Sequence, residues 1–88
     1  MLRVHQIFLA LDAAEHLDEE MLRTLAAGAL GISRSRVKKV RLQKRSLDAR
    51  DQVHFTLTAD VLLQGGEAAE RSVAGKFKPN QVVFAHLL

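Results

Sequence analysis

The order of the hydrophobic patterns along this chain constrains its fold more than any other feature. Four segments alternate apolar and polar residues, as strands with one buried face do, and two segments space their apolar residues three and four apart, as amphipathic helices do. The strand-like segments are residues 2–11, 37–46, 52–63 and 82–87, and the helix-like segments are 12–30 and 67–77. The order strand, helix, strand, strand, helix, strand predicts an α+β fold, a ferredoxin-like split βαβ sandwich with two helices on one face of an antiparallel sheet.

Several residues in these segments predict local backbone features. His5 and Gln6 interrupt the alternation of the first strand, which predicts a β-bulge. Asp12 and Asp18 are both suitable N-caps for the first helix, so its start is open by about one turn. Gly31 follows the last apolar residue of that helix and is suited to a left-handed C-terminal cap.

The size of the chain predicts one domain, and its composition limits how that domain is stabilised. Its 88 residues suit a single small domain over 1–88, and the absence of cysteine excludes disulfides and thiolate metal sites. The apolar runs are all shorter than the ~20 residues needed to cross a bilayer, and the first residues do not resemble a signal peptide. We therefore expect a cytoplasmic protein without a membrane partner. Because Leu87 and Leu88 directly follow an apolar run, we expect either a segment of a longer protein or a terminal edge strand.

The charge distribution is uneven along the chain. Residues 34–50 contain a single acid, Asp48, and eight basic residues: Arg34, Arg36, Lys38, Lys39, Arg41, Lys44, Arg45 and Arg50. Alternation predicts that Arg41, Gln43 and Arg45 share a cationic, helix-free sheet face with the polar residues of the next strand. Such a face suits plain solvation, docking onto a protein, or contact with nucleic-acid phosphates. Since the chain has no Trp or Tyr, and only Phe8 of its four Phe is expected to point outward, nucleic acid is the less favoured partner.

The sequence offers little that resembles an enzyme site. Gly65 and Gly66 form a pair at a turn rather than a phosphate-binding loop. His5 and His54 could approach each other if their strands are adjacent, but surface histidines are the simpler interpretation. Ser46 and Asp48 lie near His54 in the sequence, yet they are better suited to shaping the hairpin connection than to nucleophilic catalysis. We therefore predict no catalytic and no metal-binding residues.

One segment resembles a known family. Residues 44–50 read K-R-S-L-D-A-R, which is similar to the R-R-S-I/L-D-A-R segment in the N-terminal domain of the predicted FAD-dependent, or NAD(FAD)-utilizing, dehydrogenases. Residues 2–12 and 30–32 are similar to the first strand and the first helix end of that domain. The resemblance extends in detail to about residue 63. In that family D-A-R often continues with basic residues, whereas Asp51 and Gln52 follow here.

The resemblance implies that this domain is the N-terminal part of a longer flavoprotein, an FAD-dependent oxidoreductase. The flavin-binding fingerprint of that family follows this domain, so no flavin-binding residue is assigned here, and FAD is implied only for the parent protein. We expect a non-catalytic accessory domain that docks onto the rest of the parent protein through a basic β-hairpin. The residues expected to make docking or anion contacts are Arg41, Arg45, Ser46, Asp48 and Arg50. The alternative is a free-standing nucleic-acid-binding module that uses the basic sheet face.

Overall fold

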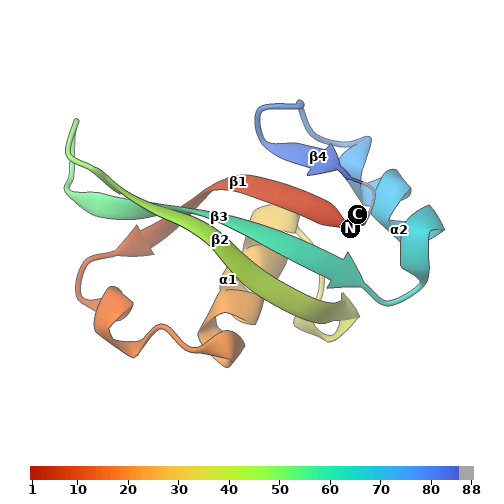
Figure 1. The fold of residues 1–88 in the computed structure, drawn as a ribbon, viewed down its shortest axis with the longest axis horizontal. Helices are drawn as coiled ribbons and strands as arrows, with labels where there is room; N and C mark the ends of the chain where they lie inside the picture. Colours follow the sequence, from red (N-terminus) through yellow and green to blue (C-terminus); the bar gives the residue numbers. More distant parts are fainter. Residues whose placement is uncertain (86–88) are drawn as a thin grey trace.

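The computed structural model describes residues 1–85 and confirms the α+β prediction. A four-stranded antiparallel sheet has the strand order β2-β3-β1-β4 and is accompanied by two α-helices and two short 3₁₀ helices (Figure 1). The elements are β1 (Leu2–Ala10), η1 (Ala13–His16), α1 (Glu19–Leu30), η2 (Arg34–Arg36), β2 (Val37–Asp48), β3 (His54–Leu63), α2 (Gly66–Ala74) and β4 (Val82–Phe84).

The hydrophobic core lies between one face of the sheet and the helices. The central strand β3 contributes Leu57, Ala59 and Val61, which are fully buried, and β1 contributes a matching set of apolar side chains. Helices α1 and α2 supply the opposing surface of the same cluster, including Leu22 and Val73. Burying a Val or Leu side chain stabilises a fold by about 1.5–3 kcal/mol, so this cluster is the main source of stability. We call the other side of the sheet the open face, since neither helix of the described chain covers it.

Helix α1 begins at the second of the two candidate caps. Oδ1 of Asp18 accepts a hydrogen bond of 2.8 Å from the backbone N–H of Met21, which satisfies one of the unpaired donors of the first turn. Asp12 instead precedes η1 and makes no such side-chain bond. The predicted C-terminal cap is confirmed, because Gly31 has a φ of 68°.

The bulge predicted in β1 is confirmed. The pairing of β1 with β3 shifts register between Val4 and Ile7, and Gln6 has a φ of 61°. A positive φ is unusual for a residue other than glycine. The extra residue lets Val4 and Ile7 both point into the core, although they are three positions apart.

Strand β2 has two register shifts against β3, between Val37 and Lys39 and between Leu42 and Lys44, and the second, which the sequence did not reveal, reverses the faces of the last part of β2. The register against β3 shifts just after Leu42. Before the bulge, Arg41 lies opposite Asp60 and therefore on the open face. After it, Arg45 lies opposite the buried Leu57 and points to the side where the helices pack. The prediction that Arg45 shares a face with Arg41 was therefore wrong.

The β2–β3 hairpin turns about two residues later in the chain than predicted, and it reaches past α1. Strand β2 extends to Asp48, which lies opposite His54, so the connection is residues 49–53 rather than the predicted 46–51. Ser46 lies inside β2, opposite Thr56, and the turn-shaping role predicted for it was wrong. Figure 1 shows the hairpin end projecting away from both helices, which leaves both of its faces uncovered by them.

The C-terminal part of the described chain closes the other end of the sheet. Helix α2 ends at Ala74, three residues before its predicted end, and β4 pairs with β1 over residues 82–84. The predicted final strand ends earlier than expected, since Ala85 is not part of β4, and its last predicted residues, His86 and Leu87, lie outside the described residues. No helix within residues 1–85 is long and apolar enough to span a membrane.

Candidate functional site

Hydrogen bonds between Asp48 and Arg50 hold the end of the hairpin in place. Oδ1 of Asp48 accepts from the backbone N–H of Arg50 at 3.1 Å and from its Nε at 3.2 Å, while Oδ2 accepts from Nη2 at 2.8 Å. The side-chain bond and then the backbone bond from Arg50 lower the pKa of Asp48 to about 2. The same pair raises the pKa of Arg50. The prediction that Asp48 shapes the hairpin connection is thus confirmed, with Arg50 as its partner.

This pair predicts a measurable pH dependence. The carboxyl ¹³C signal of Asp48 should titrate with a midpoint of about 2, below the ordinary value of about 3.9. Because the folded pKa lies below the unfolded one, the pair stabilises the fold above about pH 4 and loses this effect as pH falls toward about 2. The Arg50→Gln variant should return the midpoint toward the ordinary value. A midpoint near the ordinary value with Arg50 intact would contradict the observed pairing.

An aromatic pair lies beside the hairpin end, on the open face. The rings of Phe8 on β1 and His54 on β3 are stacked, with centroids 4.4 Å apart. Nδ1 of His54 lies 2.6 Å from the carbonyl oxygen of Gln52, to which it donates as the Nδ1–H tautomer, and Nε2 lies 3.9 Å from Oδ2 of Asp48. Phe8 is 52% exposed, which confirms the prediction that its ring points outward.

A shallow groove crosses the open face next to this aromatic pair. It consists of two depressions, with volumes of about 770 Å³ and about 300 Å³. The larger contains Phe8 and the hairpin end, and the smaller contains Lys44. Both are lined by Gln6, Ser46 and Thr56, so they adjoin one another. The groove therefore combines an exposed ring with amide, hydroxyl and ammonium groups.

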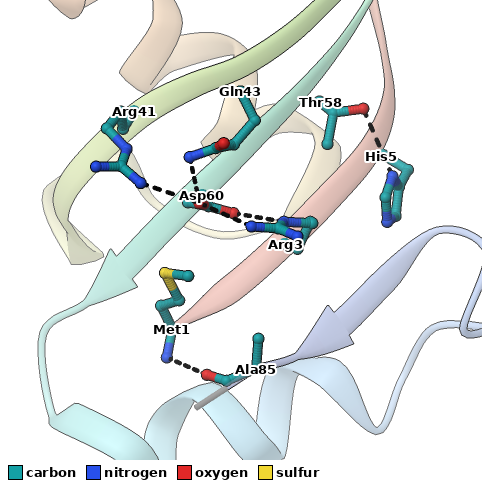
Figure 2. A network of polar contacts seen from close by, with 8 residues as sticks. All are labelled: Met1, Arg3, His5, Arg41, Gln43, Thr58, Asp60 and Ala85. Carbon is teal, nitrogen blue, oxygen red and sulfur yellow. Dashed lines mark hydrogen bonds and ion pairs between the residues drawn. The ribbon is translucent and has the colours of Figure 1, made fainter. Parts of the chain in front are cut away.

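The middle of the open face holds a nearly buried carboxylate, Asp60, which is only 5% exposed (Figure 2). Arg3 donates to it twice, from Nε to Oδ1 at 2.9 Å and from Nη2 to Oδ2 at 3.2 Å. Gln43 donates from Nε2 to Oδ2 at 2.6 Å, and Nη2 of Arg41 lies 3.8 Å away. Hydrogen bonding to Asp60 raises the pKa of Arg3. With Asp48 and Asp60 on it, the open face carries less net positive charge than predicted.

The hairpin also has an exposed apolar surface on the side where the helices pack. Leu47 lies opposite Phe55 and is 61% exposed, and the guanidinium of Arg45 lies over the Phe55 ring at 4.9 Å from its centroid. Leu11 and Val53 are exposed at the adjoining strand ends. We call these five residues the hairpin ridge. Sequence reasoning missed it, because the bulge in β2 decides which side chains gather there.

A family model described as a domain of unknown function (DUF8436) matches residues 1–62, well over half of the chain. The chain belongs to the DUF8436 family. The segment of the DUF8436 domain that is matched contains β1, α1, β2 and all but the last residue of β3, and it therefore includes the hairpin and all of the residues that line the groove except Asn80. Helix α2 and β4 lie outside the match. A comparison with curated proteins finds no match.

The DUF8436 domain forms neither the approach of His5 to His54 nor the contact of Ser46 with His54 that the sequence left conceivable. Nδ1 of His5 is 3.5 Å from Oγ1 of Thr58, and His54 lies four residues from Thr58 along β3, roughly 13 Å away, so the two histidines do not meet. Ser46 lies opposite Thr56 on β3. His54 is its diagonal neighbour, at a separation of roughly 7–8 Å. Among the described residues no group of three or more His, Cys, Asp or Glu side chains could hold a metal ion.

The five predicted contact residues divide into three places. Ser46, Asp48 and Arg50 line the larger depression of the groove. Arg41 lies beside Asp60 in the middle of the open face, and Arg45 belongs to the hairpin ridge on the opposite side. Any partner that touches all five must therefore enclose the hairpin from both faces.

Proposed function

We propose that this chain is a non-catalytic accessory domain that docks through its β2–β3 hairpin onto the rest of a longer FAD-dependent oxidoreductase. The observation that carries this proposal is the hairpin ridge, in which Leu47 and Phe55 lie next to the cationic Arg45 on a projecting hairpin. Exposed apolar groups rimmed by polar ones are typical of protein contact surfaces. Aromatic residues and arginine are also enriched in such interfaces.

The arrangement of charge supports a protein surface with acidic groups as the partner. Arg45 makes a cation–π contact with Phe55, so its guanidinium is held in place before a partner arrives. Arg50 at the hairpin end is ordered by Asp48. Side chains that are ordered in advance lose less conformational entropy on binding. In this proposal Arg41, Ser46 and Asp48 form the polar rim on the other side of the hairpin.

The proposal extends to the fold type and to the identity of the parent protein. The strand order β2-β3-β1-β4, with a helix after β1 and another after β3, supports the ferredoxin-like split βαβ arrangement. The likeness of residues 44–50 to the FAD-dependent dehydrogenases supports the oxidoreductase as the parent protein. The flavin would be held by the rest of that protein, so this domain would supply contact and orientation only.

The proposal predicts the behaviour of a ridge variant in the longer protein. Purified from its source, that protein should have a mass well above the 9.8 kDa of this chain. Leu47→Asp should then weaken docking and increase the rate at which a protease releases the domain by about tenfold. The matched control is Val83→Asp, an exposed apolar position on β4 next to Arg3, which should leave the release rate unchanged.

Leu47→Asp should leave the melting temperature of the 88-residue chain nearly unchanged, because the side chain is already mostly in water. A source protein of 9.8 kDa, or equal release rates for the two variants, would exclude docking through the ridge.

A further inference from the structure

We propose that the open face binds single-stranded nucleic acid, with one base stacked on Phe8. The open face lies opposite most of the hairpin ridge, and binding there does not rest on the docking function, although Arg41, Ser46 and Asp48 would serve in both. Phe8 lies on β1, one of the two central strands, and it is 52% exposed on a sheet face that no helix of the described chain covers. Sheets that read single strands use exposed aromatic rings on such a face to stack bases.

The Phe8 ring is held in a defined orientation. One of its neighbours is the His54 ring, stacked at 4.4 Å, and His54 is in turn oriented by its Nδ1 bond to Gln52. A fixed ring offers a stacking surface at a low entropic cost, because little side-chain motion remains to be lost. A flexible surface Phe without these contacts would be a weaker platform.

The groove supplies groups for the edge of a base. The hydroxyls of Ser46 and Thr56 and the amide of Gln6 line both of its depressions and can each donate and accept hydrogen bonds. Asp48, whose pKa is held low, stays ionised and can accept from the amino groups of adenine, cytosine or guanine. The groove thus suits a stacked base with its polar edge toward β2.

Two cations on the same face are placed to meet phosphates. Lys44 lines the smaller depression, and the guanidinium of Arg41 is 73% exposed, with its contact to Asp60 at 3.8 Å. Arg3 and Arg50 are occupied by Asp60 and Asp48 and contribute little. Two phosphate contacts on a single strand give a slope of about −1.4 for log affinity against log salt concentration, since each contributes roughly 0.7. We therefore expect weak binding, with base stacking supplying a large share of the binding free energy.

The test is fluorescence anisotropy with the 88-residue chain and a labelled ten-nucleotide single strand, as RNA and as DNA, in low salt. The native chain should bind in the micromolar range, and Phe8→Ala should weaken binding by about tenfold or more. Phe8→Leu keeps an apolar side chain on the strand but removes the ring, and it should lose the same factor. Phe8→Trp should retain binding. Leu11→Ala, at an exposed apolar position that lines neither depression of the groove, is the matched control and should change nothing.

Three further results would overturn the proposal. The first is absence of binding to either strand at about 50 mM salt. The second is an affinity that Phe8→Leu leaves intact. The third is displacement of the labelled strand by a poly-glutamate peptide as effectively as by unlabelled strand, which would indicate an acidic protein as the ligand of the open face. Lys44→Ala should reduce the salt slope by about 0.7, while an unchanged slope would exclude Lys44 as a phosphate contact.

Discussion

Replacing Arg3 by Met should lower the free energy of unfolding several times more than replacing Arg41 by Met. Arg3 makes two hydrogen bonds to Asp60, whose carboxylate is almost completely shielded from water by the sheet. Without Arg3, that charge would keep only the bond from Gln43 and the distant contact of Arg41. A partly desolvated carboxylate that loses its main partner is costly, and the methylene part of the Met side chain preserves the packing. Urea denaturation followed by circular dichroism measures the change.

The control for this prediction is Arg41→Met. Arg41 approaches the same carboxylate, but it is largely in water and 3.8 Å away, so its removal should cost about 0.5 kcal/mol or less. The double variant Arg3→Met/Asp60→Leu should be more stable than Arg3→Met alone, because it removes the unpaired charge. Equal costs for the two arginine variants, or no recovery in the double variant, would show that Arg3 does not balance Asp60.

Glu70→Ala should cost about 2–3 kcal/mol, a second large effect in a domain of roughly 5–15 kcal/mol total stability. Glu70 is 3% exposed, and its Oε2 accepts from the backbone N–H of Leu63 at 3.0 Å. Its Oε1 lies 2.8 Å from the amino group of Met1. The side chain therefore joins α2 to the end of β3 and the start of β1. Removing it leaves the backbone N–H of Leu63 unpaired and a space in the core, while the amino group of Met1 keeps only its bond to the carbonyl oxygen of Ala85.

The matched control for Glu70 lies on the same helix. Glu67 is exposed and forms an i,i+4 ion pair with Arg71, so Glu67→Ala should cost only a few tenths of a kcal/mol. Thermal unfolding of both variants gives the comparison. If Glu67→Ala and Glu70→Ala lowered the melting temperature equally, the effect would reflect helix propensity rather than the buried contacts of Glu70.

The fold could be predicted as far as apolar side chains mark the register. In β1, the polar pair His5–Gln6 breaks a row of core residues, so the bulge left a trace in the pattern. In β2, the bulge follows Leu42, and the residues around it are exposed whichever face they take. Leu42 and Leu47 lie on the same side although they are five positions apart, but both are exposed, so their spacing was a weak sign of the slip and Arg45 was placed on the wrong side. An edge strand with few core contacts carries little register information in its sequence.

The candidate sites depend on pairings between strands that are distant in the sequence. The Asp48–Arg50 pair is local, and the sequence indicated that Asp48 shapes the hairpin connection without fixing which residue is its partner. The stacking of Phe8 on His54 requires the register of β1 against β3, and the environment of Asp60 requires three strands at once. A signal for Asp60 was present, since a carboxylate in the middle of an alternating strand needs cationic partners when it is buried. The cationic partners of Asp60 could be named only once the order of the strands was known.

Amide hydrogen exchange on the 88-residue chain and on the longer protein tests the docking of the hairpin most directly. If the hairpin contacts the rest of the protein, the amides of residues 45–53 should exchange at least tenfold more slowly in the longer protein, while those of β4 should not change. Identical exchange of the hairpin amides in the two proteins, or slowing confined to β4, would contradict the docking account.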